Sequence, residues 1–145
     1  MLTVKRILCP TDFSDASKRA LELAVSVAGQ FGAEIYLLNV VPVIPHLTPS
    51  PTSHFDVPEY ERLLRADAEK QLSALAKTVS EVKVSPILSQ GDAADGILRA
   101  VDEHQIDLVV IATAGHTGWE RVVFGSVAEK VVRQAKCPVL TVRRP

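Results

Sequence analysis

The chain has 145 residues, of which 47% are hydrophobic and 23% charged, with a formal net charge of −1 at pH 7. This length predicts one compact domain, residues 1–145, and the balanced charge argues against broad attraction to nucleic acid or to an acidic membrane surface. The N-terminal segment lacks the apolar centre of a signal peptide and no apolar run approaches the roughly 20 residues that cross a bilayer, so we expect a cytoplasmic protein.

The first half of the chain predicts two strands and two helices around a proline-rich loop. The apolar run Arg6–Pro10 predicts a central strand covered on both faces, followed by a helix that Ser14 can cap. Branched and aromatic residues over Ala33–Val41 predict a second buried strand. Four prolines within 42–57 predict an irregular loop, after which Pro58 begins a helix that reaches about Val79.

The second half continues the alternation of strands and helices. The expected elements are a strand over Val84–Leu88, a helix over Ala93–His104, a strand over Asp107–Thr113, a helix from Ser126 to about Ala135 and a strand over Val139–Val142. Pro86 favours a place near the sheet edge because proline cannot donate a ladder hydrogen bond. The alternation predicts an α/β fold in which an open five-stranded parallel sheet carries helices on both faces.

The segment from Ala112 to Ser126 combines a strand end, a loop and a helix start, which is typical of an anion site. Gly115 and Gly125 bracket nine residues there. Glycine lets backbone amides approach an anion closely, and a helix start offers unpaired N–H groups and about half a positive charge. The amides expected to face a phosphate are those of Ser126, Val127 and Ala128.

The sheet topology would bring further residues to this segment. Ligands of open parallel sheets lie outside the carboxyl ends of the strands, where the winding direction reverses. There Asp12 would contact ribose hydroxyls or a magnesium ion, and Val40 would offer backbone polar groups to an adenine edge. The expected nucleotide site comprises Pro10, Thr11, Asp12, Val40, Ile111, Ala112, Thr113, Ala114, Gly115, Gly118, Gly125, Ser126, Val127 and Ala128, with Asp12 and Ser126 as candidate magnesium ligands.

These motifs resemble the universal stress protein family over nearly the whole chain. The similar segments are Pro10-Thr11-Asp12-Phe13-Ser14, the strand Asp107–Thr113, and Gly118 through Gly125-Ser126 to Cys137-Pro138-Val139-Leu140. ATP-binding members carry Gly-x2-Gly-x9-Gly-Ser/Thr, which Gly115, Gly125 and Ser126 match. Alanine stands at position 112 in place of the first glycine.

The resemblance implies a Rossmann-like sheet of the adenine nucleotide alpha hydrolase type with strand order 3-2-1-4-5. It also implies ATP as the ligand, with AMP or ADP as alternatives, and a homodimer formed through Val139–Val142. We therefore expect a nucleotide-dependent regulatory switch in stress signalling that acts on an unidentified protein partner.

Three alternatives stay open on the sequence alone. Ala112 would fit a nucleotide-free dimerisation or chaperone-like module, because an added methyl can block a backbone approach or disfavour a positive φ angle. Slow ATP hydrolysis or autophosphorylation is a second alternative, although the chain lacks a P-loop lysine and no catalytic residue is assigned. Asp12 could also serve only as a cap of the first helix.

Overall fold

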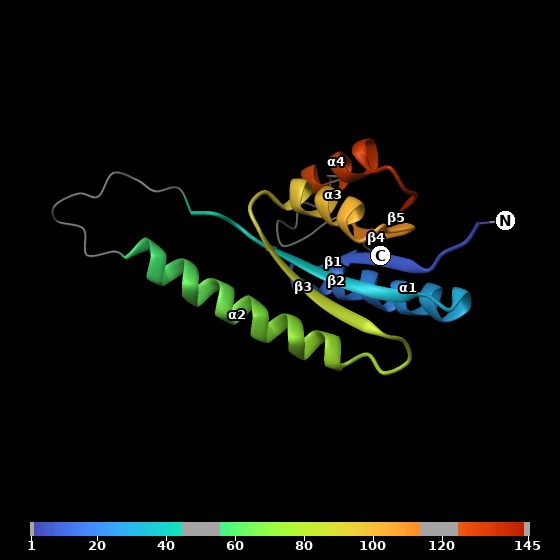
Figure 1. The fold of residues 1–145 in the computed structure, drawn as a ribbon, viewed down its shortest axis with the longest axis horizontal. Coiled ribbons are helices and arrows are strands. Elements are labelled where there is room, and N and C mark those ends of the chain that lie inside the picture. Colours follow the sequence, from blue (N-terminus) through green and yellow to red (C-terminus); the bar gives the residue numbers. More distant parts are fainter. Residues whose placement is uncertain (1, 45–55, 114–124, 144–145) are drawn as a thin grey trace.

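The computed structural model describes residues 2–44, 56–113 and 125–143, and these form a single sheet covered by helices (Figure 1). The strands are parallel and lie in the order β3-β2-β1-β4-β5, as predicted. They are β1 (Arg6–Pro10), β2 (Glu34–Val41), β3 (Val84–Gln90), β4 (Leu108–Ala112) and β5 (Val139–Val142). The helices are α1 (Asp15–Phe31), α2 (Val57–Lys77), α3 (Ala93–Glu103) and α4 (Ser126–Gln134).

The ends of the elements follow local chemistry that the sequence largely reveals. Ser14 caps α1 by accepting a hydrogen bond from the Ser17 amide, and the helix ends at Gly32 in the left-handed conformation. Helix α2 begins one residue before Pro58, because the Asp56 side chain accepts a hydrogen bond from a first-turn amide. The predicted boundaries are therefore right to within about two residues, including those of β3, which is two residues longer than expected.

The sheet is buried on both faces, which explains its continuous apolar strands. Helices α1 and α2 cover one face and α3 and α4 cover the other (Figure 1). Within β1, Ile7 and Cys9 pack toward α1 and α2, whereas Leu8 packs toward α3 and α4. Each of the three is fully buried. A strand with two apolar faces cannot alternate apolar with polar residues, so its sequence reads as an apolar run.

Strands β3 and β5 form the two edges of the sheet. Pro86 is exposed within β3, which agrees with the edge position expected for it. None of the helices in the described ranges is long and apolar enough to cross a bilayer.

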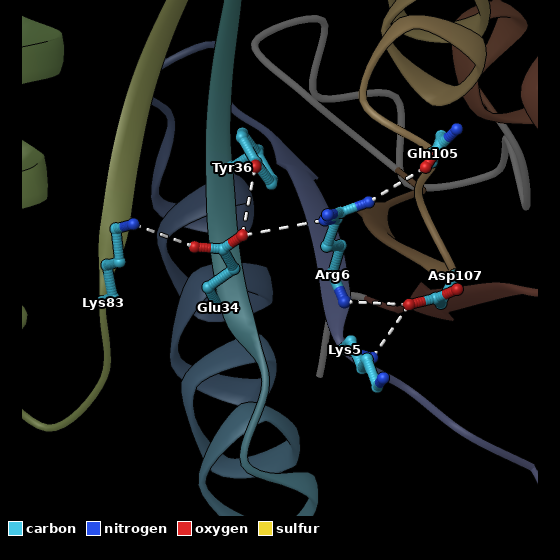
Figure 2. A network of polar contacts seen from close by, with 7 residues as sticks. All are labelled: Lys5, Arg6, Glu34, Tyr36, Lys83, Gln105 and Asp107. Carbon is cyan, nitrogen blue, oxygen red and sulfur yellow. Dashed lines mark hydrogen bonds and ion pairs between the residues drawn. The ribbon is translucent and has the colours of Figure 1, made fainter.

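A polar network joins the strand starts at the amino-terminal edge of the sheet (Figure 2). The Asp107 carboxylate accepts hydrogen bonds from the backbone amides of Lys5 and Arg6, at 2.8 and 3.0 Å. Glu34 lies 3.2 Å from the Lys83 ammonium and 3.8 Å from the Arg6 guanidinium. These contacts hold the strand starts together at the amino-terminal edge of the sheet. The predicted site lies at the opposite edge, where the strands have their carboxyl ends.

Candidate functional site

The carboxyl ends of β1, β2 and β4 and the first turns of α3 and α4 enclose a pocket of about 350 Å³. This size lies within the range of cofactor and small-ligand sites. Predicted site residues that line the pocket are Pro10, Thr11, Asp12, Val40, Ile111, Ala112, Thr113, Gly125, Ser126, Val127 and Ala128. Its other lining residues are Ser17, Leu38, Asn39, Ala93 and Ile97. The remaining predicted residues, Ala114, Gly115 and Gly118, lie outside the described residues.

A tight turn between β1 and α1 places Asp12 at the pocket. The Asp12 carboxylate accepts a hydrogen bond from the Ser14 amide at 2.9 Å, and Ser14 in turn caps α1. Asp12 therefore organises the turn before the helix, while the cap itself is Ser14. Between them, Phe13 has a φ of 66°, a left-handed conformation that is rare for a bulky residue. Such strain is typical of functional turns held in place by their surroundings.

Buried hydrogen bonds beneath this turn fix the end of β1. The Asn39 side-chain amide donates to the Thr11 carbonyl oxygen at 2.8 Å, and the Thr11 amide donates to Leu38 O at 2.8 Å. The hydroxyls of Thr11 and Ser17 lie 3.0 Å apart and share a hydrogen bond. Thr11 and Asn39 are only 6% and 9% exposed, so these bonds operate largely without competition from water.

Sequence reasoning missed Asn39 and Ser17. The signal for Asn39 was present, because this amide interrupts the apolar run of β2 just before its carboxyl end. A buried polar side chain at that position needs a partner, and the neighbouring strand end supplies one. Ser17 gave no comparable signal, since a serine in the first turn of a helix is ordinary.

Backbone geometry opens the start of α4 to the pocket. The Gly125 amide donates to the Thr113 carbonyl oxygen at 2.7 Å, and a Cβ added at Gly125 would lie 3.0 Å from that oxygen. Glycine is thus favoured there by space, because its φ of −68° suits any residue. Side chains cap α1, α2 and α3, whereas the N-cap Gly125 provides no side-chain hydrogen bond. First-turn amides without a cap are suited to an anion.

Ala112 occupies the last position of β4 and pairs with Val142 of β5. Among the described residues other than glycine, only Phe13 and Gln105 have positive φ values. Position 112 therefore does not require the conformational freedom of glycine, and the alanine methyl causes no backbone strain. This removes one physical argument for the nucleotide-free alternative.

An ion pair joins the two helices that flank the pocket. The Lys130 ammonium of α4 lies 2.7 Å from the Asp95 carboxylate of α3 and 3.9 Å from that of Asp92. The hydrogen bond to Lys130 holds the pKa of Asp95 below its usual value of 3.8. Both carboxylates are exposed and the Lys130 side chain is partly exposed, so the ion pair contributes little to the stability of the fold.

Comparisons with known proteins cover almost the whole chain. A sequence model of the universal stress protein family matches residues 3–143. A universal stress protein of Methanocaldococcus jannaschii is 36% identical over 143 residues, which is 97% of this chain and 83% of the relative. Among solved structures, UspA of Lactobacillus plantarum has a TM-score of 0.78 at 31% identity and covers 97% of this chain and 98% of its own. The universal stress protein from Archaeoglobus fulgidus in complex with dAMP has the same fold, with a TM-score of 0.68 at 21% identity and coverage of 97% and 98%.

Proposed function

The chain belongs to the universal stress protein family, and from this membership we propose that it binds an adenine nucleotide, ATP, in the pocket at the carboxyl ends of β1, β2 and β4. The observation that carries the proposal is the first turn of α4, whose N-cap Gly125 offers no side-chain cap and which lines this pocket with Ser126, Val127 and Ala128. Its backbone amides suit a phosphate group. The dAMP complex of the Archaeoglobus fulgidus protein supports an adenine mononucleotide unit as the ligand.

The chemistry of the pocket suits the separate parts of a nucleotide. Leu38, Val40 and Ile97 supply apolar surface from β2 and α3, which suits a purine ring. The Asp12 carboxylate suits ribose hydroxyls, and the α4 amides suit phosphates. A nucleotide would thus lie across the sheet, with its base toward α3 and its phosphates toward α4.

The residues also fit a magnesium ion that arrives with the phosphates. Within the described ranges, no three His, Cys, Asp or Glu side chains gather into a metal site. Magnesium in nucleotide sites is commonly held by one or two protein oxygens together with phosphates and water. The Ser126 hydroxyl and, as the alternative to its ribose contact, the Asp12 carboxylate would supply those oxygens here. When bound, the ion would neutralise phosphate charge.

The role that follows is a regulatory switch in a stress response, read by a protein partner, in which ATP is a signal and not a substrate for rapid turnover. The sequence has no P-loop lysine.

Homodimerisation through β5 is part of the proposal. Strand β5 pairs only with β4 among the described strands, and Leu140 on it and Val132 on α4 are 37% and 45% exposed. Light scattering after size exclusion tests the dimer, which Leu140→Asp should weaken.

Calorimetry with ATP and adenosine tests the proposed function. Ser126→Ala removes one hydroxyl beside the phosphate site, and a hydrogen bond to a charged group contributes about 1.5–3 kcal/mol. ATP affinity should fall about ten- to a hundredfold, whereas adenosine affinity should not change. Ser26→Ala, which removes an exposed hydroxyl from α1, is the matched control. Absence of binding by the wild-type protein at about 1 mM ATP would contradict the proposal.

A further inference from the structure

Helix α3 approaches the pocket through a residue that has no side chain. Ala93 and Ile97 of α3 line the pocket, and Gly96 between them packs against Val40, which also lines it. A Cβ added at Gly96 would lie 2.9 Å from Val40 Cγ2 and 3.2 Å from Val40 Cγ1. Two non-bonded carbon atoms 2.9 Å apart would overlap, so either Val40 or the backbone of α3 would have to shift.

Space, and not backbone conformation, explains the glycine at this position. Gly96 lies inside α3 and lacks the positive φ found at Gly32 and Gly91. Glycine in a helix interior is less favourable than alanine, because it has more conformational freedom to lose on folding. The cost of glycine is offset here by the close packing of Val40 against α3, which a side chain at position 96 would prevent.

Val40 has little freedom to yield. It is branched at Cβ, which restricts rotation about χ1, and both of its methyl groups already lie close to Gly96. An added Cβ would force one methyl to turn away from α3 or would displace the carboxyl end of β2. Either response changes the pocket at the apolar side that we assign to the base.

Resting on the proposed function, we propose that Gly96 sets the geometry of the nucleotide pocket on the side that receives the base. Because Gly96 has no side chain, Val40 can pack directly against α3. This packing sets the width of the part of the pocket that receives the adenine ring. Gly96 acts through Val40 and is a positioning residue without contact to the ligand. Gly96 of α3 and Val40 of β2 thus act as a pair that shapes the side of the pocket assigned to the base.

Calorimetric titration of wild type, Gly96→Ala, Val40→Ala and the double variant with AMP and ATP tests the pair. Overpacking a tight site disfavours the native geometry enough that Gly96→Ala should weaken both nucleotides about tenfold. The two factors should be equal, because the change lies at the base and not at the phosphates. In the Val40→Ala background, adding Gly96→Ala should change affinity less than about threefold, because the clashing methyls are gone.

Gly29→Ala in α1 is the matched control, since a Cβ there meets nothing within 4 Å. It should bind both nucleotides as the wild type does. Thermal unfolding of every variant separates weaker binding from a loss of fold. If Gly96→Ala does not fold, recovery of folding in the double variant supports the contact with Val40, and an unfolded double variant overturns it.

Three other results would overturn the inference. Gly96→Ala could bind as tightly as Gly29→Ala, or it could weaken binding equally with and without the Val40 methyls. It could also weaken ATP and AMP by clearly different factors, which would place its effect at the phosphates. These differ from failure of the proposed function, in which the wild-type protein binds neither nucleotide.

Discussion

Replacing Asn39 by leucine tests whether the buried hydrogen bond beneath the β1–α1 turn holds the site together. Leucine has a similar branched shape but cannot donate to the Thr11 carbonyl oxygen, which accepts from Asn39 at 2.8 Å. Because Thr11 is only 6% exposed, water cannot readily replace the lost donor. An unsatisfied buried acceptor costs about 1–3 kcal/mol, so we expect a loss of stability in that range.

Urea denaturation followed by circular dichroism measures this loss as a lower midpoint at unchanged slope. The thermal midpoint should fall by about 2–4 °C for each kcal/mol. Gln71→Leu is the matched control: its amide donates to Asp67 at 2.7 Å on the exposed surface of α2, and stability should stay within about 0.5 kcal/mol. ATP affinity should also fall in Asn39→Leu, since Thr11 precedes Asp12. A variant as stable as the control would refute the reasoning.

Three further results follow from local chemistry. Burial raises the pKa of the Cys9 thiol to about 12. A thiol reagent at neutral pH should therefore modify half-buried Cys137 first and Cys9 only on unfolding. Prompt reaction of Cys9 in a Cys137→Ser variant would contradict this. The hydrogen bond to Lys83 is the largest cause that holds the pKa of Glu34 below 4.5. The stability advantage of wild type over Glu34→Gln should therefore be present above pH 4.5 and disappear as the pH falls through the lowered pKa, and denaturation midpoints that differ equally at all pH values would count against it. The Gly32→Ala variant should have a free energy of unfolding about 1–2 kcal/mol lower than wild type in denaturant, because α1 ends at Gly32 with a φ of 68° that disfavours alanine. An unchanged denaturation midpoint would show that alanine can leave the left-handed region at no cost.

Local patterns were sufficient to predict the elements of this fold. Apolar runs such as Arg6–Pro10 could be read as strands because a parallel sheet covered on both faces tolerates few polar side chains. Caps and breakers such as Ser14 and Gly32 marked the ends of α1 because they act within one turn of the chain. The strand order followed from the family resemblance, and the structure has the same order.

The sequence by itself thus determined the elements and the edge of the sheet at which residues such as Asp12, Val40 and Ser126 gather. Only the tertiary structure decided that Asn39 holds Thr11 and that Gly96 packs against Val40. These contacts join residues on different elements, 28 positions apart in the first case. The reason is physical: caps and periodicity depend on neighbours within a few residues, whereas a buried hydrogen bond or a missing side chain has meaning only once distant segments are packed together.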